Sequence, residues 1–330
     1  MATTRAVGLI DMTLTRRSKS ILWATMSVLT AWVLLSVFWA PAHMISTTPY
    51  RVDETPASRG LDYQDIKIPS DGLLLEGWWI PASEPIADLI FVHGAGSNRI
   101  SQYIGSLDFY RTLHELNISV VTMDIRNHGN SPVTDGTLRM GLAEWPDVVA
   151  TAQWLDQHQP SARPRILIGA SMGGSTVIHA MVNGLKADAL ILLDPLLDVL
   201  DSMMEGGEIE TGLPAPLFAI AARAAIYEYG LPHGDKSPLA LAQTLDLPIL
   251  MMQDWDDPVT RSPFASELAS TNPRVTLIRV PTISVEEACL DGKEEWGTHV
   301  AAHPCRPEWT RQTVSAFVQS VVDRTPTFER

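Results

Sequence analysis

A five-residue segment, GASMG at positions 169–173, constrains the fold more than any other part of the chain. It follows an apolar, β-branched run typical of a buried strand, and it opens a stretch with the composition of a helix. A serine placed between two such elements lies on a sharp, strained turn, and flanking glycines let the helix approach the strand closely. The segment therefore predicts a strand–turn–helix unit that exposes the hydroxyl of Ser171.

Beyond residue 60, short apolar runs alternate with longer amphipathic ones. This alternation is typical of βαβ units and predicts an α/β fold: a mostly parallel, eight-stranded sheet flanked by helices. Strands are expected at residues 64–69, 73–80, 88–92, 119–124, 165–169, 189–193, 249–253 and 276–280, the first two as a hairpin. Helices are expected at residues 100–116, 145–158, 172–183, 263–270 and 308–323. Active residues of such a sheet collect at the carboxyl ends of its strands.

The N-terminal part has a different character. Residues 21–40 form an uncharged apolar run of 20 residues, long enough to cross a bilayer, after a flank with four basic residues and one acidic residue. This pattern predicts a cytoplasmic basic stub (1–20), a transmembrane signal anchor in contact with the lipid bilayer (21–42), a linker (43–60) and an extracytoplasmic domain (61–330), in the periplasm or at the cell surface. The sequence Ala40-Pro41-Ala42 resembles a cleavage site, so a cleaved signal peptide is the alternative, although its apolar region is normally shorter.

Composition excludes several classes of protein. The net charge of −14 argues against a nucleic-acid partner, because neutralising phosphates requires a surplus of Lys and Arg. A hydrophobic fraction of 45% argues against disorder, and two cysteines are too few for a disulfide-framework miniprotein.

Two more motifs occur where strands are expected to end: LIFVHGAGSN at residues 89–98 and MDIRNHGNSP at residues 123–132. With GASMG, they make residues 60–325 resemble an α/β-hydrolase of the serine esterase, lipase and peptidase type. The resemblance implies that Ser171 is the nucleophile and that the backbone amides of Met172 and Ala95 form the oxyanion hole. It implies no cofactor and no metal.

In this family the acid follows the serine in the chain, and the histidine follows the acid. The DDPV sequence at residues 256–259 makes Asp257 the expected acid, with Asp254 and Asp256 as close alternatives. Asp194 and Asp198, after the preceding strand, are further candidates.

Nine histidines are present, and most are explained by positions in the linker, in helices or in the turn motifs. Only His299 and His303 lie between the last expected strand and the last expected helix. The sequence Trp296-Gly297-Thr298-His299 resembles the family's approach to its catalytic base, so His299 is the expected base and His303 the reserve.

Cys289 and Cys305 bracket this loop. Outside the cytoplasm two cysteines are more often paired than free, and a disulfide here would stabilise the fold by about 3 kcal/mol and restrain the His299 loop. The alternative is a zinc site formed by these cysteines with His299 and His303, but their spacing matches no standard zinc pattern.

An insertion at about residues 198–244 occurs where the resembled family carries a cap over its serine. Its apolar side chains are expected either to line an acyl pocket or to pack the cap onto the core: Met203, Met204, Leu217, Phe218 and Tyr227. The sequence as a whole predicts an extracytoplasmic serine hydrolase that cleaves a carboxylic ester of a small or lipid-like molecule, with a lipid or cell-envelope acyl ester favoured. A serine peptidase, an acyltransferase and a non-catalytic binding protein of the same fold are the alternatives.

Overall fold

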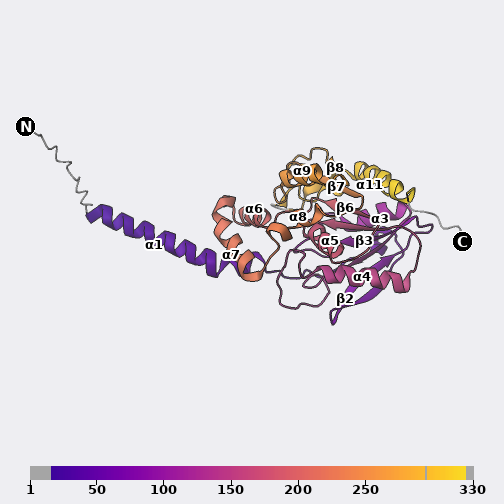
Figure 1. Ribbon diagram of the computed structural model, residues 1–330, viewed down its shortest axis with the longest axis horizontal. Coiled ribbons are helices and arrows are strands. Elements are labelled where there is room, and N and C mark those ends of the chain that lie inside the picture. The colour runs from indigo at the N-terminus through magenta and orange to yellow at the C-terminus, as the bar shows by residue number, and fades with distance from the viewer. Residues whose placement is uncertain (1–15, 294–295, 325–330) are drawn as a thin grey trace, which may run out of the picture.

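A single eight-stranded sheet organises the domain (Figure 1). The computed structural model describes residues 16–293 and 296–324, so residues 1–15 of the expected stub lie outside the described part. The strands are β1 (Gln64–Ser70), β2 (Leu73–Ile80), β3 (Ala87–Val92), β4 (Ile118–Met123), β5 (Arg165–Ala170), β6 (Ala189–Leu193), β7 (Ile249–Gln253) and β8 (Val275–Arg279). Their order is β1-β2-β4-β3-β5-β6-β7-β8. The pairs β1/β2 and β2/β4 are antiparallel and the other pairs are parallel, which confirms the expected mostly parallel sheet.

Helices cover both faces of the sheet. One face packs against α4 (Trp145–His158), α5 (Met172–Val182) and α9 (Ser262–Thr271), and the other against α3 (Ser106–Glu115) and α11 (Pro307–Val322). Strands β3 to β7 are buried along their whole length except at Arg165, the first residue of β5, because side chains on both sides of the sheet enter these two cores. The rigid centre of the sheet therefore presents the carboxyl ends of five neighbouring strands at one edge.

The helix expected at residues 100–116 differs from the structure, because α3 begins only at Ser106. The side chain of Asn98 accepts a hydrogen bond from the backbone N–H of Ile100 at 2.8 Å, which favours a turn over a helix. Gly105 then takes a left-handed conformation with φ of 62°, which ends the turns and starts the helix.

The insertion between β6 and β7 is helical. It contains α6 (Val199–Thr211), α7 (Ala219–Tyr229) and the short α8 (Pro238–Ala242), with 3-10 turns at Ala215–Phe218 and Gly234–Lys236. Asp198 caps the start of α6 by accepting a hydrogen bond from the backbone N–H of Asp201 at 2.8 Å. The segment from α6 to α7 bends by 115°, so the two helices form an angled pair at one end of the domain.

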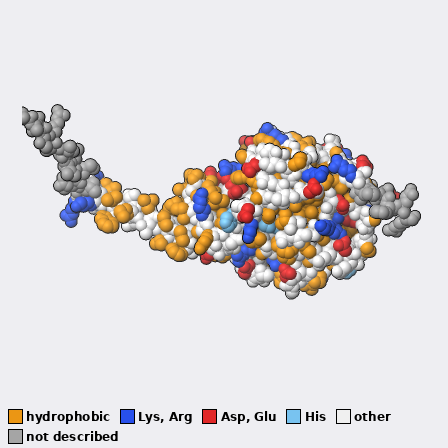
Figure 2. Space-filling model, in the orientation of Figure 1, with side chains coloured by type: hydrophobic (Ala, Val, Ile, Leu, Met, Phe, Trp, Pro, Cys, Tyr) orange, Lys and Arg blue, Asp and Glu red, His pale blue; other side chains and the backbone are white. Residues whose placement is uncertain are grey.

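Helix α1 (Arg16–Phe38) projects from the domain as a long apolar rod (Figures 1 and 2). Among the described residues it is the one unbroken helix long and apolar enough to cross a membrane, a test that a signal sequence near the N-terminus also passes. Its last turns and the short α2 (Ala40–Met44) contact α7. The apolar rod and the β6–β7 insertion are therefore neighbours.

Residues 43–60, the expected linker, make contacts with the domain. Ile45 is fully buried in the core, and its carbonyl accepts a hydrogen bond from the Leu138 backbone at 2.7 Å. Thr47 donates to the carbonyl of Gly136 at 2.9 Å, and a 3-10 turn follows at Pro56–Arg59. The burial of Ile45 in the hydrophobic core therefore attaches the start of this segment to the domain.

Candidate active site

Ser171 lies at the turn between β5 and α5 with φ of 51° and ψ of −123°. This conformation is unfavourable for a residue with a side chain and costs on the order of 1–3 kcal/mol, so the surrounding packing must hold it. The packing leaves no room for side chains nearby. A Cβ on Gly169 would lie 2.4 Å from the carbonyl of Gly173, and one on Gly173 would lie 2.3 Å from the carbonyl of Val92. The expected tight turn is present, and its glycines are required by close backbone contacts.

The structure brings Ser171, Asp257 and His299 together. His299 lies with Nε2 at 2.9 Å from Oγ of Ser171 and Nδ1 at 2.7 Å from Oδ2 of Asp257. The other carboxylate oxygen of Asp257 accepts hydrogen bonds from the backbone N–H groups of Val259 and Thr260, each at 2.7 Å. Because the acid accepts from Nδ1–H, Nε2 carries the lone pair that faces the serine hydroxyl.

The alternative acids have other partners. Asp254 is buried, and one of its carboxylate oxygens accepts from the backbone N–H of Asp256 at 3.1 Å. Asp256 is exposed, and Asp198 is the cap of α6. Of the carboxylates considered, only Asp257 hydrogen-bonds to His299 within residues 16–293 and 296–324.

Asp194 has a role that sequence reasoning missed. Its carboxylate accepts hydrogen bonds from the backbone N–H groups of Asp254, at 2.7 Å, and Val300, at 3.1 Å. It thus joins the loop that carries Asp257 to the loop that carries His299. Burial, and then the neighbouring Asp257 carboxylate, raise the pKa of Asp194 well above its ordinary value. Its position directly after β6 was a usable signal, but nothing local indicates a bridge between two loops.

Lys293 is a second residue that the sequence did not point to. Its ammonium group is buried and donates hydrogen bonds to the carbonyl of His299 at 2.6 Å and to that of Tyr103 at 3.0 Å. Burial lowers the pKa of Lys293 to about 8. Cys289 and Cys305 form a disulfide in the same region, as expected. The loop around His299 is thus restrained by a buried lysine and by a covalent bond.

His303, the reserve base, lies elsewhere. Its Nε2 is 3.1 Å from Oγ1 of Thr112, and its ring packs against Phe109. Burial lowers the pKa of His303 to about 4, so the ring is neutral at pH 7. The disulfide also removes both thiols from the alternative zinc site, and residues 16–293 and 296–324 contain no cluster of three or more His, Cys, Asp or Glu suited to a metal.

The two backbone segments expected to supply the oxyanion hole lie next to Ser171. Met172 is the first residue of α5, where a helix leaves its N–H groups without intrahelical acceptors. Gly94 and Ala95 line the cavity beside Ser171, and a Cβ on Gly94 would lie 3.1 Å from the Cβ of Ser171. The turn after β3 and the start of α5 thus both lie beside the serine.

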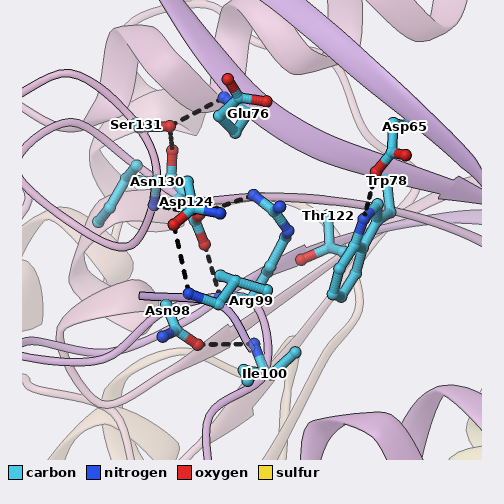
Figure 3. A network of polar contacts seen from close by, with 12 residues as sticks. Asp65, Glu76, Trp78, Asn98, Arg99, Ile100, Thr122, Asp124, Asn130 and Ser131 are labelled. Carbon is cyan, nitrogen blue, oxygen red and sulfur yellow. Dashed lines mark hydrogen bonds and ion pairs between the residues drawn. The ribbon is translucent and has the colours of Figure 1, made fainter. Parts of the chain in front are cut away.

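A buried ion pair between Arg99 and Asp124 fixes the turn after β3 (Figure 3). Arg99 lies at the end of this turn, and its guanidinium contacts the carboxylate of Asp124 at 2.7 Å. Asp124 also accepts hydrogen bonds from the backbone N–H groups of Arg99 and Asn130, each at 2.8 Å, while the guanidinium lies 4.4 Å from the centre of the Trp78 ring. Burial raises the pKa of Asp124, and Arg99 opposes that shift. The motif at residues 123–132 therefore anchors the turn that carries Ala95.

A cavity of about 560 Å³ opens at Ser171 and His299. Its walls come from the turn after β3, from α6, from the Trp296–Val300 loop and from residues that follow α1. The apolar residues expected in the insertion are divided: Met203 lines the cavity, Met204 packs beside the core, the Phe218 ring lies against α6, and Leu217 and Tyr227 are exposed.

Comparisons with known proteins agree with this architecture. A sequence model described as the alpha/beta hydrolase family matches residues 89–322. The esterase Pf2001 of Pyrococcus furiosus is similar in structure, with a TM-score of 0.67 and 21% identity over 83% of this chain and 98% of that one. Est1E of Butyrivibrio proteoclasticus, solved with ferulic acid bound, has a TM-score of 0.57 and 15% identity over 78% of this chain and all (100%) of that one. The esterase EaEST of Exiguobacterium antarcticum has a TM-score of 0.52 and 17% identity, with coverages of 78% and 100%. A comparison with curated proteins found no match.

Proposed function

Because the chain belongs to the alpha/beta hydrolase family, we propose that it is a membrane-anchored serine hydrolase that cleaves carboxylic esters outside the cytoplasm. One observation carries the proposal. The two ring nitrogens of His299 lie within hydrogen-bond distance of Ser171 and Asp257, 2.9 Å and 2.7 Å away, at the opening of a cavity. This is the geometry that activates a serine hydroxyl by general-base catalysis.

In the first half-reaction, Oγ of Ser171 attacks the ester carbonyl carbon while Nε2 of His299 takes the hydroxyl proton. Asp257 keeps Nδ1–H in place and stabilises the imidazolium that forms. The carbonyl oxygen becomes an oxyanion that the N–H groups of Met172 and Ala95 stabilise. When the tetrahedral intermediate collapses, the alcohol leaves with the proton from His299, and the acyl group remains on Ser171.

In the second half-reaction, His299 takes a proton from water, and the hydroxide attacks the acyl carbon. Collapse breaks the bond to Ser171, returns the proton to Oγ and releases the carboxylic acid. Asp194 and Lys293 touch no reacting atom. Their hydrogen bonds fix the positions of the loops that carry Asp257 and His299. This matters because even a small displacement of a catalytic base lowers the reaction rate strongly.

Ester hydrolysis is favoured over amide hydrolysis by the structural neighbours, three of which are named as esterases or bind an aromatic carboxylic acid. The lining of the cavity by the apolar side chains of Met140, Leu196 and Met203 suits an ester with an apolar acyl group. We place the β6–β7 insertion over the serine as a cap, because α6 forms part of the cavity wall.

The anchor is favoured over a cleaved signal peptide by the length of the apolar run at residues 21–40, since the apolar region of a signal peptide is normally about 7–15 residues long. Pro41, in the middle of the cleavage-like sequence, is buried in α2, and α2 packs against α7. The disulfide between Cys289 and Cys305 suits an oxidising compartment outside the cytoplasm.

Hydrolysis of p-nitrophenyl esters tests the activity. The detergent-solubilised full chain is expected to cleave acetate to decanoate esters and to leave the matching anilides nearly untouched, whereas Ser171→Ala is expected to be inactive. Cleavage of the anilides at rates equal to those of the esters would point to a peptidase. Ester cleavage that survives in Ser171→Ala would overturn the proposal.

A further inference from the structure

Helix α7 lies beside the membrane end of α1. From residue 20 to residue 38, the side chains of α1 that are not exposed are Trp32, Ser36 and Val37, in its last turns, where it contacts α7. At 1.5 Å per residue, Ser36 lies roughly 6 Å along the axis from residue 40, the end of the apolar run. If residues 21–40 cross the bilayer, α7 therefore lies at the depth of an interfacial helix, whose apolar face is buried about 5–10 Å into the boundary between headgroups and acyl chains.

The bend between α6 and α7 is uncharged and apolar, as a segment at this depth in the membrane must be. No charged residue occurs from position 211 to position 222. Leu213 and Leu217 are 52% and 41% exposed, and Tyr227 on α7 is 91% exposed. In water these side chains would expose apolar surface to solvent, whereas an interface accommodates both leucine and tyrosine. Figure 2 shows hydrophobic side chains running from α1 onto the adjoining end of the domain.

The same end of the molecule forms a wall of the active-site cavity. His43, Met44 and Thr48, immediately after α1, line the cavity together with Gly206 and Gly207 of α6. A Cβ placed on Gly206 would meet no atom within 4 Å, so the α6 wall is open at this point. The cavity thus lies between the end of the apolar rod and the cap.

From these contacts we propose that the outer leaflet covers the α6–α7 bend and that the cavity receives its substrate, a long-chain acyl ester, directly from that leaflet. The inference rests on the proposed anchor and on the proposed ester hydrolysis. It adds a surface, the exposed apolar side chains Leu213, Leu217 and Tyr227, and a partner, the lipid monolayer. An acyl chain enters between α2 and α6, and its ester group reaches Ser171.

Depth-dependent quenching tests the surface independently of activity. Both native cysteines are in a disulfide, so a single added cysteine can carry a fluorophore: Leu217→Cys at the bend, or Leu74→Cys on β2 as the control. Leu74 is 49% exposed, and β2 lies far from α1 in Figure 1. With the full chain in phosphatidylcholine vesicles, lipids that carry a nitroxide near the headgroup are expected to quench the label at position 217 and not at position 74. Equal, weak quenching at both positions would overturn the inference.

Activity tests the route. Neither Leu213 nor Leu217 lines the cavity, so Leu213→Asp/Leu217→Asp is expected to cleave p-nitrophenyl acetate at the wild-type rate. Its cleavage of a long-chain ester embedded in vesicles is expected to fall at least fivefold, whereas Leu74→Asp changes neither rate. Equal vesicle rates in the variant and the wild type would overturn the inference alone. A wild-type chain that cleaves no ester in either form would instead overturn the proposed function, and if the double variant fails to fold, the quenching result decides.

Discussion

Two buried networks at the carboxyl edge of the sheet are built around an aspartate with a fully buried side chain. Asp124, after β4, pairs with Arg99, and Asp257, after β7, pairs with His299; each carboxyl side chain is 0% exposed. Burial therefore does not distinguish them. In the Asp124 network the carboxylate accepts hydrogen bonds from backbone amides, and the Arg99 guanidinium lies over the Trp78 ring (Figure 3). In the Asp257 network the hydrogen bonds continue through His299 to the hydroxyl of Ser171, which faces a cavity.

The difference shows how one kind of interaction can serve two purposes. A buried carboxylate with all its partners inside the protein fixes a turn, and its loss is a loss of stability. A buried carboxylate whose partner is a titratable ring facing a cavity can support proton transfer, and its loss is a loss of rate. Substitutions in the Asp124 network should therefore lower mainly the stability, and substitutions in the Asp257 network mainly the reaction rate.

The largest effect is expected from Asp257→Asn. The amide cannot hold the Nδ1–H tautomer of His299, so kcat on a soluble ester should fall by about 10⁴-fold. The urea-unfolding midpoint should change little, because the amide oxygen still accepts from Val259 and Thr260. Asp254→Asn is the matched control and should lose less than tenfold. Equal losses in both variants would show that the acid has been assigned to the wrong residue.

Asp124→Asn should show the reverse. It leaves the Arg99 charge buried without a counter-charge, which lowers the free energy of unfolding by about 3–5 kcal/mol. Activity per folded molecule at low temperature should fall less than tenfold. Replacing Arg99 with Met in the same chain should recover part of the stability, because no buried charge remains. A single variant as stable as the wild type in urea would contradict the role of this network as an anchor.

Removal of the disulfide with Cys289→Ser/Cys305→Ser should lower the free energy of unfolding by about 3 kcal/mol, because the unfolded chain regains the freedom of a loop with a sequence separation of 16. Rates should fall as well, since the His299 loop loses its covalent restraint. Treatment of the wild type with a reductant should reproduce both effects, and the double variant should not respond to it. Unchanged unfolding in the double variant would refute the restraint.

The smallest effect is expected for His303, which lies outside the hydrogen-bond network of Asp257, His299 and Ser171. Its pKa is about 4 in the folded chain and about 6.5 when unfolded, so the unfolded chain binds the proton first as pH falls. Stability should therefore drop between pH 6.5 and pH 4, by about 2 kcal/mol at pH 5 from this residue. His303→Gln should flatten the decline measured by urea unfolding at each pH, and it should keep its activity at pH 7. A variant that is inactive when folded would return His303 to the position of catalytic base.

Much of the molecule follows from local sequence. Periodicity is enough to predict the eight strands, because β1 alternates polar and apolar residues and the others are short, mostly apolar runs between breakers. The GASMG turn pointed to Ser171, and chain order pointed to His299. The choice of Asp257 was less secure, because Asp254, Asp256 and Asp257 lie within four residues and only the fold shows which one meets the ring.

The remaining features depend on contacts between distant segments. Strand β4 inserts between β2 and β3, an order that periodicity does not contain. Asp194 joins two loops and Lys293 holds a carbonyl of a third segment, and neither residue has a local pattern that predicts this. The residues after α1 form a cavity wall because Ile45 is drawn into the core. Each of these features is decided by tertiary packing.

Labelling with a fluorophosphonate probe tests the central claim, that the network ending at Ser171 is open and reactive. The probe forms a covalent bond with a serine only if a base activates its hydroxyl. We expect the wild-type chain to gain one adduct, which peptide mass spectrometry places on Ser171, and Ser171→Ala and His299→Gln to gain none. A folded wild-type chain that remains unlabelled would contradict the claim.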